Sequence, residues 1–122
     1  IPQIAILTKG DEARFFALLD ERLELCRKAL MCRHENLKGT LSDISPIHWQ
    51  YGAIARLKKG EKIDRYLMNG YSTISLGYIG LYEASILITG ASHTQPKGEA
   101  FARKVLQRMS DACTRWREES GI

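Results

Sequence analysis

Two long stretches of the chain carry apolar residues at every third or fourth position, which is the spacing of one helix face. The first covers residues 11–37 and the second covers residues 96–119. Asp11 and Glu12 open the first stretch, where the helix dipole favours anions, and Gly39 follows it as a typical helix end. We therefore predict two long amphipathic helices, whose apolar positions include Phe15, Leu19, Leu23, Leu30, Phe101, Val105, Met109, Ala112 and Trp116.

Two shorter apolar stretches lack this helical spacing and contain several β-branched residues. Residues 1–7 read IPQIAIL, and residues 71–76 read YSTISL. Short runs of this composition are typical of strands, and Pro2 suits the entry of a strand. We predict one strand in each stretch.

The rest of the chain is predicted to form short helices and loops. Residues 81–89 are mostly apolar, as expected of a buried helix. Two more short helices are predicted at 53–59 and 61–68, with loops at 40–51 and 90–95. The expected fold class is therefore α/β and predominantly helical, with two short strands and long outer helices.

Composition excludes several classes of protein. Apolar residues make up 44% and charged residues 26% of the chain, which is ordinary for a globular protein. No apolar run reaches the roughly 18 residues of a membrane span, and no signal peptide is visible. We expect a cytoplasmic location and no membrane partner. The first methionine is Met31, so we expect a piece of a longer protein.

The formal net charge is +4, and the basic residues are spread along the chain. Residues 1–60 contain ten Lys or Arg and seven Asp or Glu, and residues 61–122 contain eight and seven. The nearest approach to a basic cluster is the short run Arg56-Leu57-Lys58-Lys59. Nucleic-acid-binding proteins more often carry a basic stripe with aromatic residues between the cations. Binding to nucleic acid is therefore not expected.

The three cysteines are Cys26, Cys32 and Cys113. Their spacing suits neither a redox pair nor a zinc site, so we expect buried free thiols in a reducing compartment. His48 and His93 lie in predicted loops without a partner at ligand spacing. No metal site is expected in this chain.

The most informative segment is residues 69–83, NGYSTISLGYIGLYE. A predicted strand here leads through Gly77 and Gly80 into a predicted helix. Glycine lets the backbone adopt positive φ and lets other groups approach closely, and a helix start offers free N–H groups to an anion. The turn can line a substrate cavity or hold an anion. Alternatively, the two glycines only permit tight packing of strand and helix.

The whole segment resembles the G-x-x-T-I-S-L-G-Y-I-G-L-x-E stretch of anaerobic (class III) ribonucleoside-triphosphate reductases, which are glycyl-radical enzymes. Three other stretches look similar to this family as well. They are IPQIAI at residues 1–6, WQYGAIARL at residues 49–57, and the end of the last predicted helix, REESG, at residues 117–121. The resemblance covers essentially the whole chain, and the G-Y-I-G-L string is its most specific part.

This resemblance implies that residues 1–122 are one segment of a larger ten-stranded α/β barrel domain, without a complete domain boundary. The parent enzyme is expected to reduce ribonucleoside triphosphates to deoxyribonucleotides for DNA replication by glycyl and thiyl radical chemistry. It is also expected to bind nucleotide effectors such as ATP, to need a radical-SAM activating enzyme, and to form a homodimer. The thiyl cysteine, the radical glycine and a C-terminal zinc site are expected outside these residues.

None of the three cysteines, nor Gly121, is therefore expected to be catalytic, and the isolated piece is expected to be inactive. The candidate lining of the nucleotide site is Ser75, Gly77, Tyr78 and Gly80, with packing into the barrel wall as the alternative role. A different function remains open, that of a stand-alone helical nucleotide- or anion-binding module. Because of unpaired strand edges, we expect the piece either to self-associate or to be held inside a larger chain.

Overall fold

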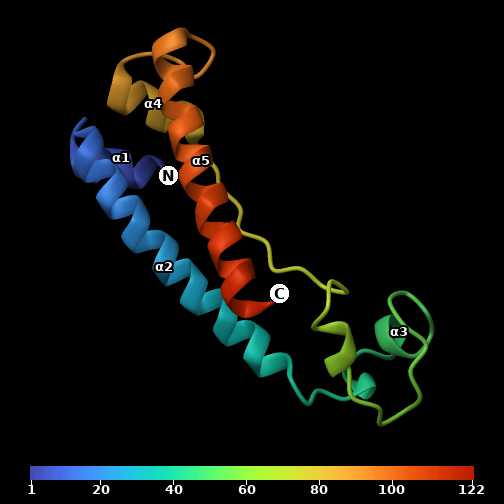
Figure 1. Ribbon diagram of the computed structural model, residues 1–122. Coiled ribbons are helices and arrows are strands. Elements are labelled where there is room, and N and C mark those ends of the chain that lie inside the picture. The colour runs from blue at the N-terminus through green and yellow to red at the C-terminus, as the bar shows by residue number, and fades with distance from the viewer. The chain divides into compact units, whose positions relative to one another are not determined.

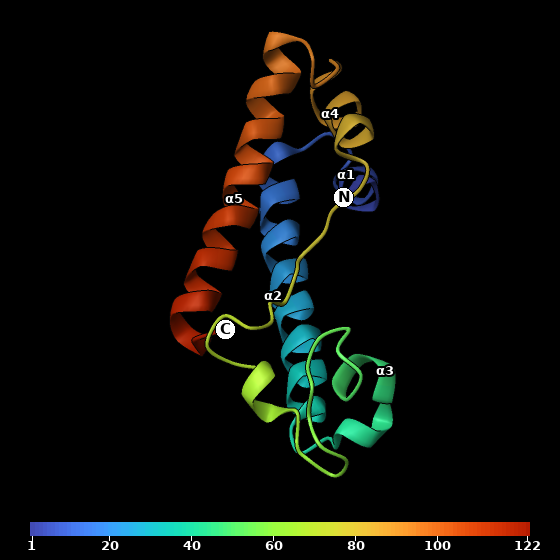
Figure 2. The same cartoon turned by 90° about the vertical axis from the view of Figure 1, so that its right-hand side faces the viewer.

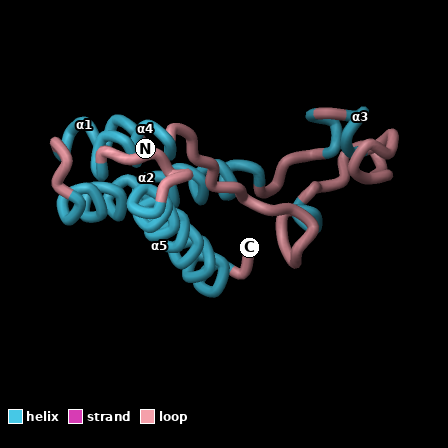
Figure 3. The backbone as a smooth tube through the Cα atoms, turned by 90° about the horizontal axis from the view of Figure 1, so that it is seen from above, coloured by secondary structure: helices cyan, strands magenta, loops and turns pink.

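The regular secondary structure of the protein consists of helices only, as the tube in Figure 3 shows. The computed structural model describes residues 1–122. The α-helices are α1 (Pro2–Thr8), α2 (Glu12–Leu37), α3 (Pro46–Trp49), α4 (Leu81–Thr89) and α5 (Pro96–Ser120), and the 3-10 helices are η1 (Ser42–Ile44) and η2 (Asp64–Tyr66). A single isolated β-bridge joins Leu41 to Lys62. The predominantly helical class is confirmed.

The two long helices lie where the sequence pattern predicted them (Figure 1). The Asp11 carboxylate accepts a hydrogen bond of 3.0 Å from the backbone N–H of Arg14, which caps the start of α2. Beyond the end of α2, Gly39 adopts a φ of +77°, the left-handed conformation that glycine tolerates best. Pro96 occupies the first position of α5, where a missing N–H costs nothing. The predicted helix at residues 81–89 is also confirmed as α4.

Both predicted strands are wrong. Residues 2–8 form helix α1, with Pro2 in its first turn and the Thr8 hydroxyl donating to the carbonyl of Ile4 at 2.9 Å. Residues 71–76 form no strand and no helix. A strand needs a neighbour to satisfy its N–H and C=O groups, and no other segment pairs with either stretch. A helix satisfies those groups within the segment itself, which is what α1 does.

The segments between α2 and α4 also differ from the sequence prediction. Residues 53–59 form no helix, because their N–H groups bond back to α3. The N–H groups of Ile54 and Ala55 donate to the carbonyl of His48 at 2.9 and 3.0 Å. The predicted helix at 61–68 is reduced to the single turn η2, and the predicted loop at 40–51 contains η1 and α3.

The chain divides into two compact units. Unit 1 comprises Ile1–Arg27 and Ser75–Trp116, and its core lies between the first half of α2 and α5. The rings of Phe15 and Phe101 meet there at 5.1 Å in an edge-to-face arrangement. Helices α1 and α4 pack against each other at one end of the same core (Figure 1). Each fully buried aromatic or branched side chain in this core contributes about 1.5–3 kcal/mol to stability.

Unit 2 comprises Lys28–Ile74 and Arg117–Ile122 and has a smaller core of its own, made by Ala55, Leu57, Ile63 and Leu67. Figure 2 shows α3 with the irregular segments that follow it in green. Backbone hydrogen bonds hold these segments together, since the N–H of Ser42 donates to Glu61 at 2.8 Å and the N–H of Ile63 donates to Thr40 at 3.0 Å. Unit 2 is therefore held by loop-to-loop bonding around a few apolar side chains.

None of the helices combines the length and the apolar composition that crossing a membrane requires.

Candidate functional site

All four candidate site residues lie in unit 1, in the irregular segment that leads into α4. Ser75, Gly77 and Tyr78 are exposed, and Gly80 is half-buried. Gly80 is the N-cap of α4 and has a φ of +78°. The segment therefore places three of the four residues at the surface and uses the fourth to start a helix.

Gly77 and Tyr78 line a cavity of about 210 Å³, whereas Ser75 and Gly80 do not. Most of the other lining residues are apolar and come from α1, from the segment itself and from the long helices. They are Ile1, Ile4, Leu19, Leu23, Leu76, Ile79 and Met109. A mostly apolar cavity with few polar groups is the usual form of a small-molecule site. Gly77 and Tyr78 are thus the two candidate residues that can touch a ligand held there.

The remaining lining residues of this cavity, Arg22 and Cys26, were not predicted as site residues. They are four positions apart on α2 and therefore lie on one side of that helix. Helical spacing alone predicts that Arg22 and Cys26 lie near each other and near Leu19 and Leu23. It does not predict that residues 76–79 lie against this part of α2, because these residues are far from α2 in the sequence.

The start of α4 is not an open anion site. A Cβ atom built on Gly80 would lie only 2.2 Å from Cγ of Pro2, so the proline ring packs directly against this glycine. A carboxylate oxygen of Glu83 lies 3.5 Å from the same position. Glu83 belongs to the first turn of α4, where its negative charge already balances the helix dipole. Gly80 therefore serves close packing, and this geometry argues against the anion-binding alternative.

The prediction that the cysteines are buried is wrong, because Cys26, Cys32 and Cys113 are all exposed. Two packed helices bury only one narrow stripe of each. On α5 this stripe contains Met109 and Ala112, and Cys113 lies one residue further round the helix. The three thiols are free and form no disulfide.

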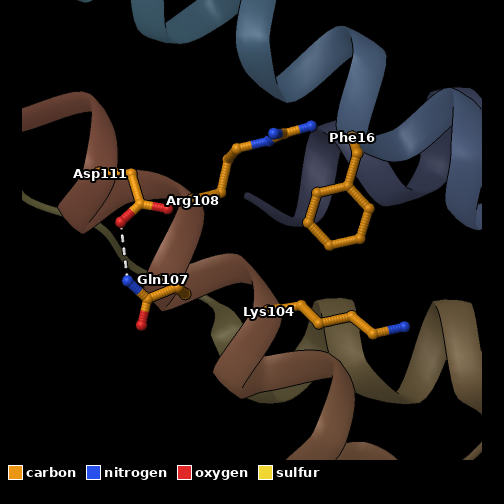
Figure 4. A pocket seen from close by; sticks show the side chains of 5 residues that line it. All are labelled: Phe16, Lys104, Gln107, Arg108 and Asp111. Atoms are coloured by element: carbon orange, nitrogen blue, oxygen red, sulfur yellow. Dashed lines mark hydrogen bonds between the residues drawn. The ribbon is translucent and has the colours of Figure 1, made fainter. Parts of the chain in front are cut away.

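A second cavity of about 340 Å³ lies along the contact of α2 and α5, and Figure 4 shows its lining. Its polar side chains already have partners within the protein. Lys104 binds Glu12 at 2.8 Å, Arg108 binds Asp20 at 3.1 Å, and the Gln107 amide donates to Asp111 at 2.7 Å. Because these charges neutralise one another, the cavity is part of the helix packing and not an anion site.

No group of three or more His, Cys, Asp or Glu side chains is arranged to hold a metal ion. The residues of this chain therefore do not fit a zinc site.

Comparison with known proteins gives matches over the whole chain. The family model described as anaerobic ribonucleoside-triphosphate reductase matches residues 1–122. The anaerobic ribonucleoside-triphosphate reductase of Escherichia coli K12 is 40% identical over 124 residues, covering 99% of this chain and 17% of the relative's length. The enzyme of the same name from enterobacteria phage T4 is 38% identical over 127 residues, covering all of this chain and 20% of the relative.

The relative from Haemophilus influenzae is 37% identical over 128 residues and is likewise covered to 17% of its length. The chain thus spans about a fifth or less of the curated relatives that it matches. No solved structure matches the chain significantly. The full-length match to the family model and the 37–40% identity to its members show that this chain belongs to the anaerobic ribonucleoside-triphosphate reductase family.

Proposed function

We propose that this chain is part of an anaerobic reductase that converts ribonucleoside triphosphates to deoxyribonucleotides. This proposal rests on the match of residues 1–122 to the family model. It is supported by relatives of the same name that align with 99–100% of the chain. The chain supplies helices and one wall of the substrate cavity. The longer protein is proposed to form the ten-stranded α/β barrel, of which this chain is a mainly helical segment.

The substrate contact proposed for this chain is the exposed pair Gly77 and Tyr78. Both line the apolar cavity beside α2, and Gly77 has open space around its α-carbon. A tyrosine ring offers a flat apolar face and one hydroxyl, which suits contact with a nucleoside. Ser75 remains a candidate at the edge of the segment, whereas Gly80 is used to pack Pro2.

The radical chemistry is proposed to be carried out by residues outside this chain. The three cysteines are exposed on helix surfaces, and no cluster of metal ligands is present. The thiyl cysteine, the glycyl radical, the zinc site and the effector site are therefore proposed for the rest of the longer protein. The radical-SAM activating enzyme and a second subunit are its proposed partners.

The test uses a chimera in which these residues replace the matching segment of the Escherichia coli relative. We expect the chimera to reduce ribonucleoside triphosphates, and we expect Tyr78→Ala and Gly77→Ala to raise the KM for the substrate. Gly77→Ala is the sharper variant, because a Cβ at this position meets no atom within 4 Å and the fold is not disturbed. Gly80→Ala cannot serve here, because it collides with Pro2.

Ser110→Ala, an exposed position on α5 away from the cavity, is the matched control. An active chimera whose KM and kcat are unchanged by both cavity variants would exclude the substrate contact while leaving the reductase assignment intact. A correctly folded chimera without any reductase activity would argue against the assignment itself.

A further inference from the structure

The cavity beside α2 that contains Gly77 and Tyr78 is apolar where it is deepest and more polar where it meets solvent. Its buried lining residues have at most 8% of their surface accessible and are all apolar, namely Ile4, Leu19, Leu23 and Met109. The exposed lining residues are Arg22, Cys26, Gly77, Tyr78 and Ile79, which we call the rim. The rim contains the only charged side chain and the only hydroxyl of the cavity, so a ligand meets its polar contacts there.

Arg22 is the charged side chain of the rim, and nothing in the lining balances its charge. The four positions that share its side of α2, three and four residues away, are uncharged. They are Leu18, Leu19, Leu25 and Cys26. Arg22 also forms no ion pair and no side-chain hydrogen bond with any other part of the chain. Its guanidinium is therefore free to bind an anion from outside.

The surroundings of Arg22 on its other side do not oppose an anion. Arg22 also belongs to the lining of a neighbouring cavity of about 450 Å³, together with Arg14 and Glu21. Glu21 forms no ion pair with either arginine. Two arginines and one glutamate leave this neighbouring cavity with a positive charge. A negatively charged group at Arg22 therefore meets an excess of positive charge on both sides.

The volume of the cavity beside α2 limits which part of a ligand it can enclose. At about 210 Å³ it is smaller than the roughly 300–1,000 Å³ of a site that surrounds a whole drug-sized ligand. It can hold a ring against its buried apolar residues. Charged groups attached to that ring must stay at the rim, because burying a charge without a partner is costly.

We infer that Arg22 is a specificity residue that binds the phosphate chain of the ribonucleoside triphosphate, while the nucleoside lies against Gly77 and Tyr78. A guanidinium donates paired N–H bonds whose geometry matches the oxygens of a phosphate group. This inference rests on the proposed substrate contact at Gly77 and Tyr78. It adds the group that distinguishes a triphosphate from an uncharged nucleoside.

Binding to the chain itself tests the contact without any need for activity. The chain is prepared with an acetylated α-amino group, so that Ile1, which also lines the cavity, adds no second cation. NMR follows the Arg22 Nε–H and the Gly77 amide during titration with CTP, and separately with cytidine. CTP is used because ATP is also an expected effector. We expect CTP to shift both signals and cytidine to shift only that of Gly77.

Two results of this titration overturn the inference. One is an Arg22 signal that stays unshifted at millimolar CTP. The other is equal affinity for CTP and for inorganic triphosphate, which would mean that Arg22 binds any anion without regard to the nucleoside.

Variants separate a charge contact from a packing role. Arg22→Met keeps an unbranched apolar side chain but removes the charge, and Lys28→Met removes a charge from an exposed position of α2 outside this cavity. We expect Arg22→Met to weaken CTP binding about tenfold or more, as expected for the loss of hydrogen bonds to a charged group. Cytidine binding should stay the same, Arg22→Lys should recover part of the loss, and Lys28→Met should change neither ligand. Equal losses for CTP and cytidine would show that Arg22 only covers apolar surface and would overturn the inference.

The chimera with the Escherichia coli relative extends the test to turnover. Arg22→Met should raise its KM for CTP about tenfold, because a binding contact is lost. An active chimera whose KM is unchanged by Arg22→Met overturns the inference and leaves the reductase assignment intact. A folded chimera without activity argues against the proposed function instead, and the binding measurements on the chain then decide the role of Arg22 by themselves.

Discussion

Gly98 and Gly77 show how differently two glycines constrain this protein. A Cβ atom built on Gly98 would lie 2.1 Å from the carbonyl oxygen of Ser92 and 2.6 Å from that of Ala91. At Gly77 the same atom would meet nothing within 4 Å. Gly98 is therefore needed so that the start of α5 can approach the loop before it, and Gly77 is not needed for packing.

We expect Gly98→Ala to destabilise the protein by about 1–3 kcal/mol, because backbone atoms must move to admit the methyl group. Gly77→Ala should change the free energy of unfolding very little. Urea unfolding of the two variants checks this. Equal midpoints for Gly98→Ala and the wild type would show that the loop at residues 91–92 is not held against α5 as described.

Ser85 is a buried hydroxyl that links three parts of unit 1. It lies on α4, and its single proton is shared between the carbonyl of Ala91 at 3.0 Å and that of Gly98 at 3.2 Å. Because a buried polar group must be hydrogen-bonded to be tolerated, Ser85 joins the middle of α4 to the loop after it and to the start of α5 in a defined geometry.

We expect Ser85→Ala to cost about 1 kcal/mol of stability, the usual net value of one hydrogen bond in a folded protein. Ser110→Ala, at an exposed position of α5, should cost nothing measurable. Thermal unfolding compares the two. A Tm for Ser85→Ala equal to that of Ser110→Ala would contradict the proposed link.

At the scale of elements, α2 and α5 combine an apolar contact with a series of ion pairs at its edge. Glu12 pairs with Lys104, Asp20 with Arg108, and Glu24 with Arg115, at 2.8, 3.1 and 3.5 Å. Their side chains are about half exposed, so water competes for the charges. The apolar core holds the two helices together, and the ion pairs favour one alignment of α2 along α5.

A double-mutant cycle of Asp20→Asn and Arg108→Gln should give a coupling of about 0.2–1 kcal/mol at low salt. The coupling should largely disappear near 1 M salt, because screening then acts over about 3 Å. Unfolding is followed in urea, because guanidinium chloride is itself a salt and would screen the ion pair. A coupling that is unaffected by salt would mean that the pair contributes by packing and not by charge.

Helix α1 forms from residues whose composition predicted a strand. Its sequence contains β-branched residues and no charge, yet in this chain it is a helix that packs against α4. In the isolated chain we expect helical Cα chemical shifts for residues 2–8 by NMR. Extended shifts for these residues would argue against α1.

At the scale of the whole molecule, the chain is a small part of the proposed enzyme. It corresponds to 17–20% of the length of its relatives, its cysteines lie on helix surfaces, and it has no metal cluster. We expect the isolated chain to form no deoxyribonucleotide from ribonucleoside triphosphates, even with an activating enzyme and a reductant. The full-length Escherichia coli relative under the same conditions is the control. Any turnover by the isolated chain would overturn the placement of the catalytic residues outside it.

Local features of the sequence determined a large part of the structure. The spacing of Phe15, Leu19 and Leu23, the carboxylate of Asp11 and the position of Gly39 each act within a few residues. These local features are therefore enough to predict α2 without any tertiary contact. The same holds for α5, which begins at Pro96. The string at residues 69–83 was also enough to indicate the family, because a motif depends on residue identity and not on its neighbours in space.

Only the tertiary structure decided features that join distant parts of the chain. Whether residues 1–7 and 71–76 form strands depends on partners that this chain does not provide, so the β-branched composition was misleading. The return of residues 53–57 onto α3 removed a predicted helix, and Arg22 became part of the cavity wall only because residues 76–79 cross α2. Periodicity and capping are written into neighbouring residues, whereas strand pairing, cavities and exposed surfaces depend on which distant segments meet.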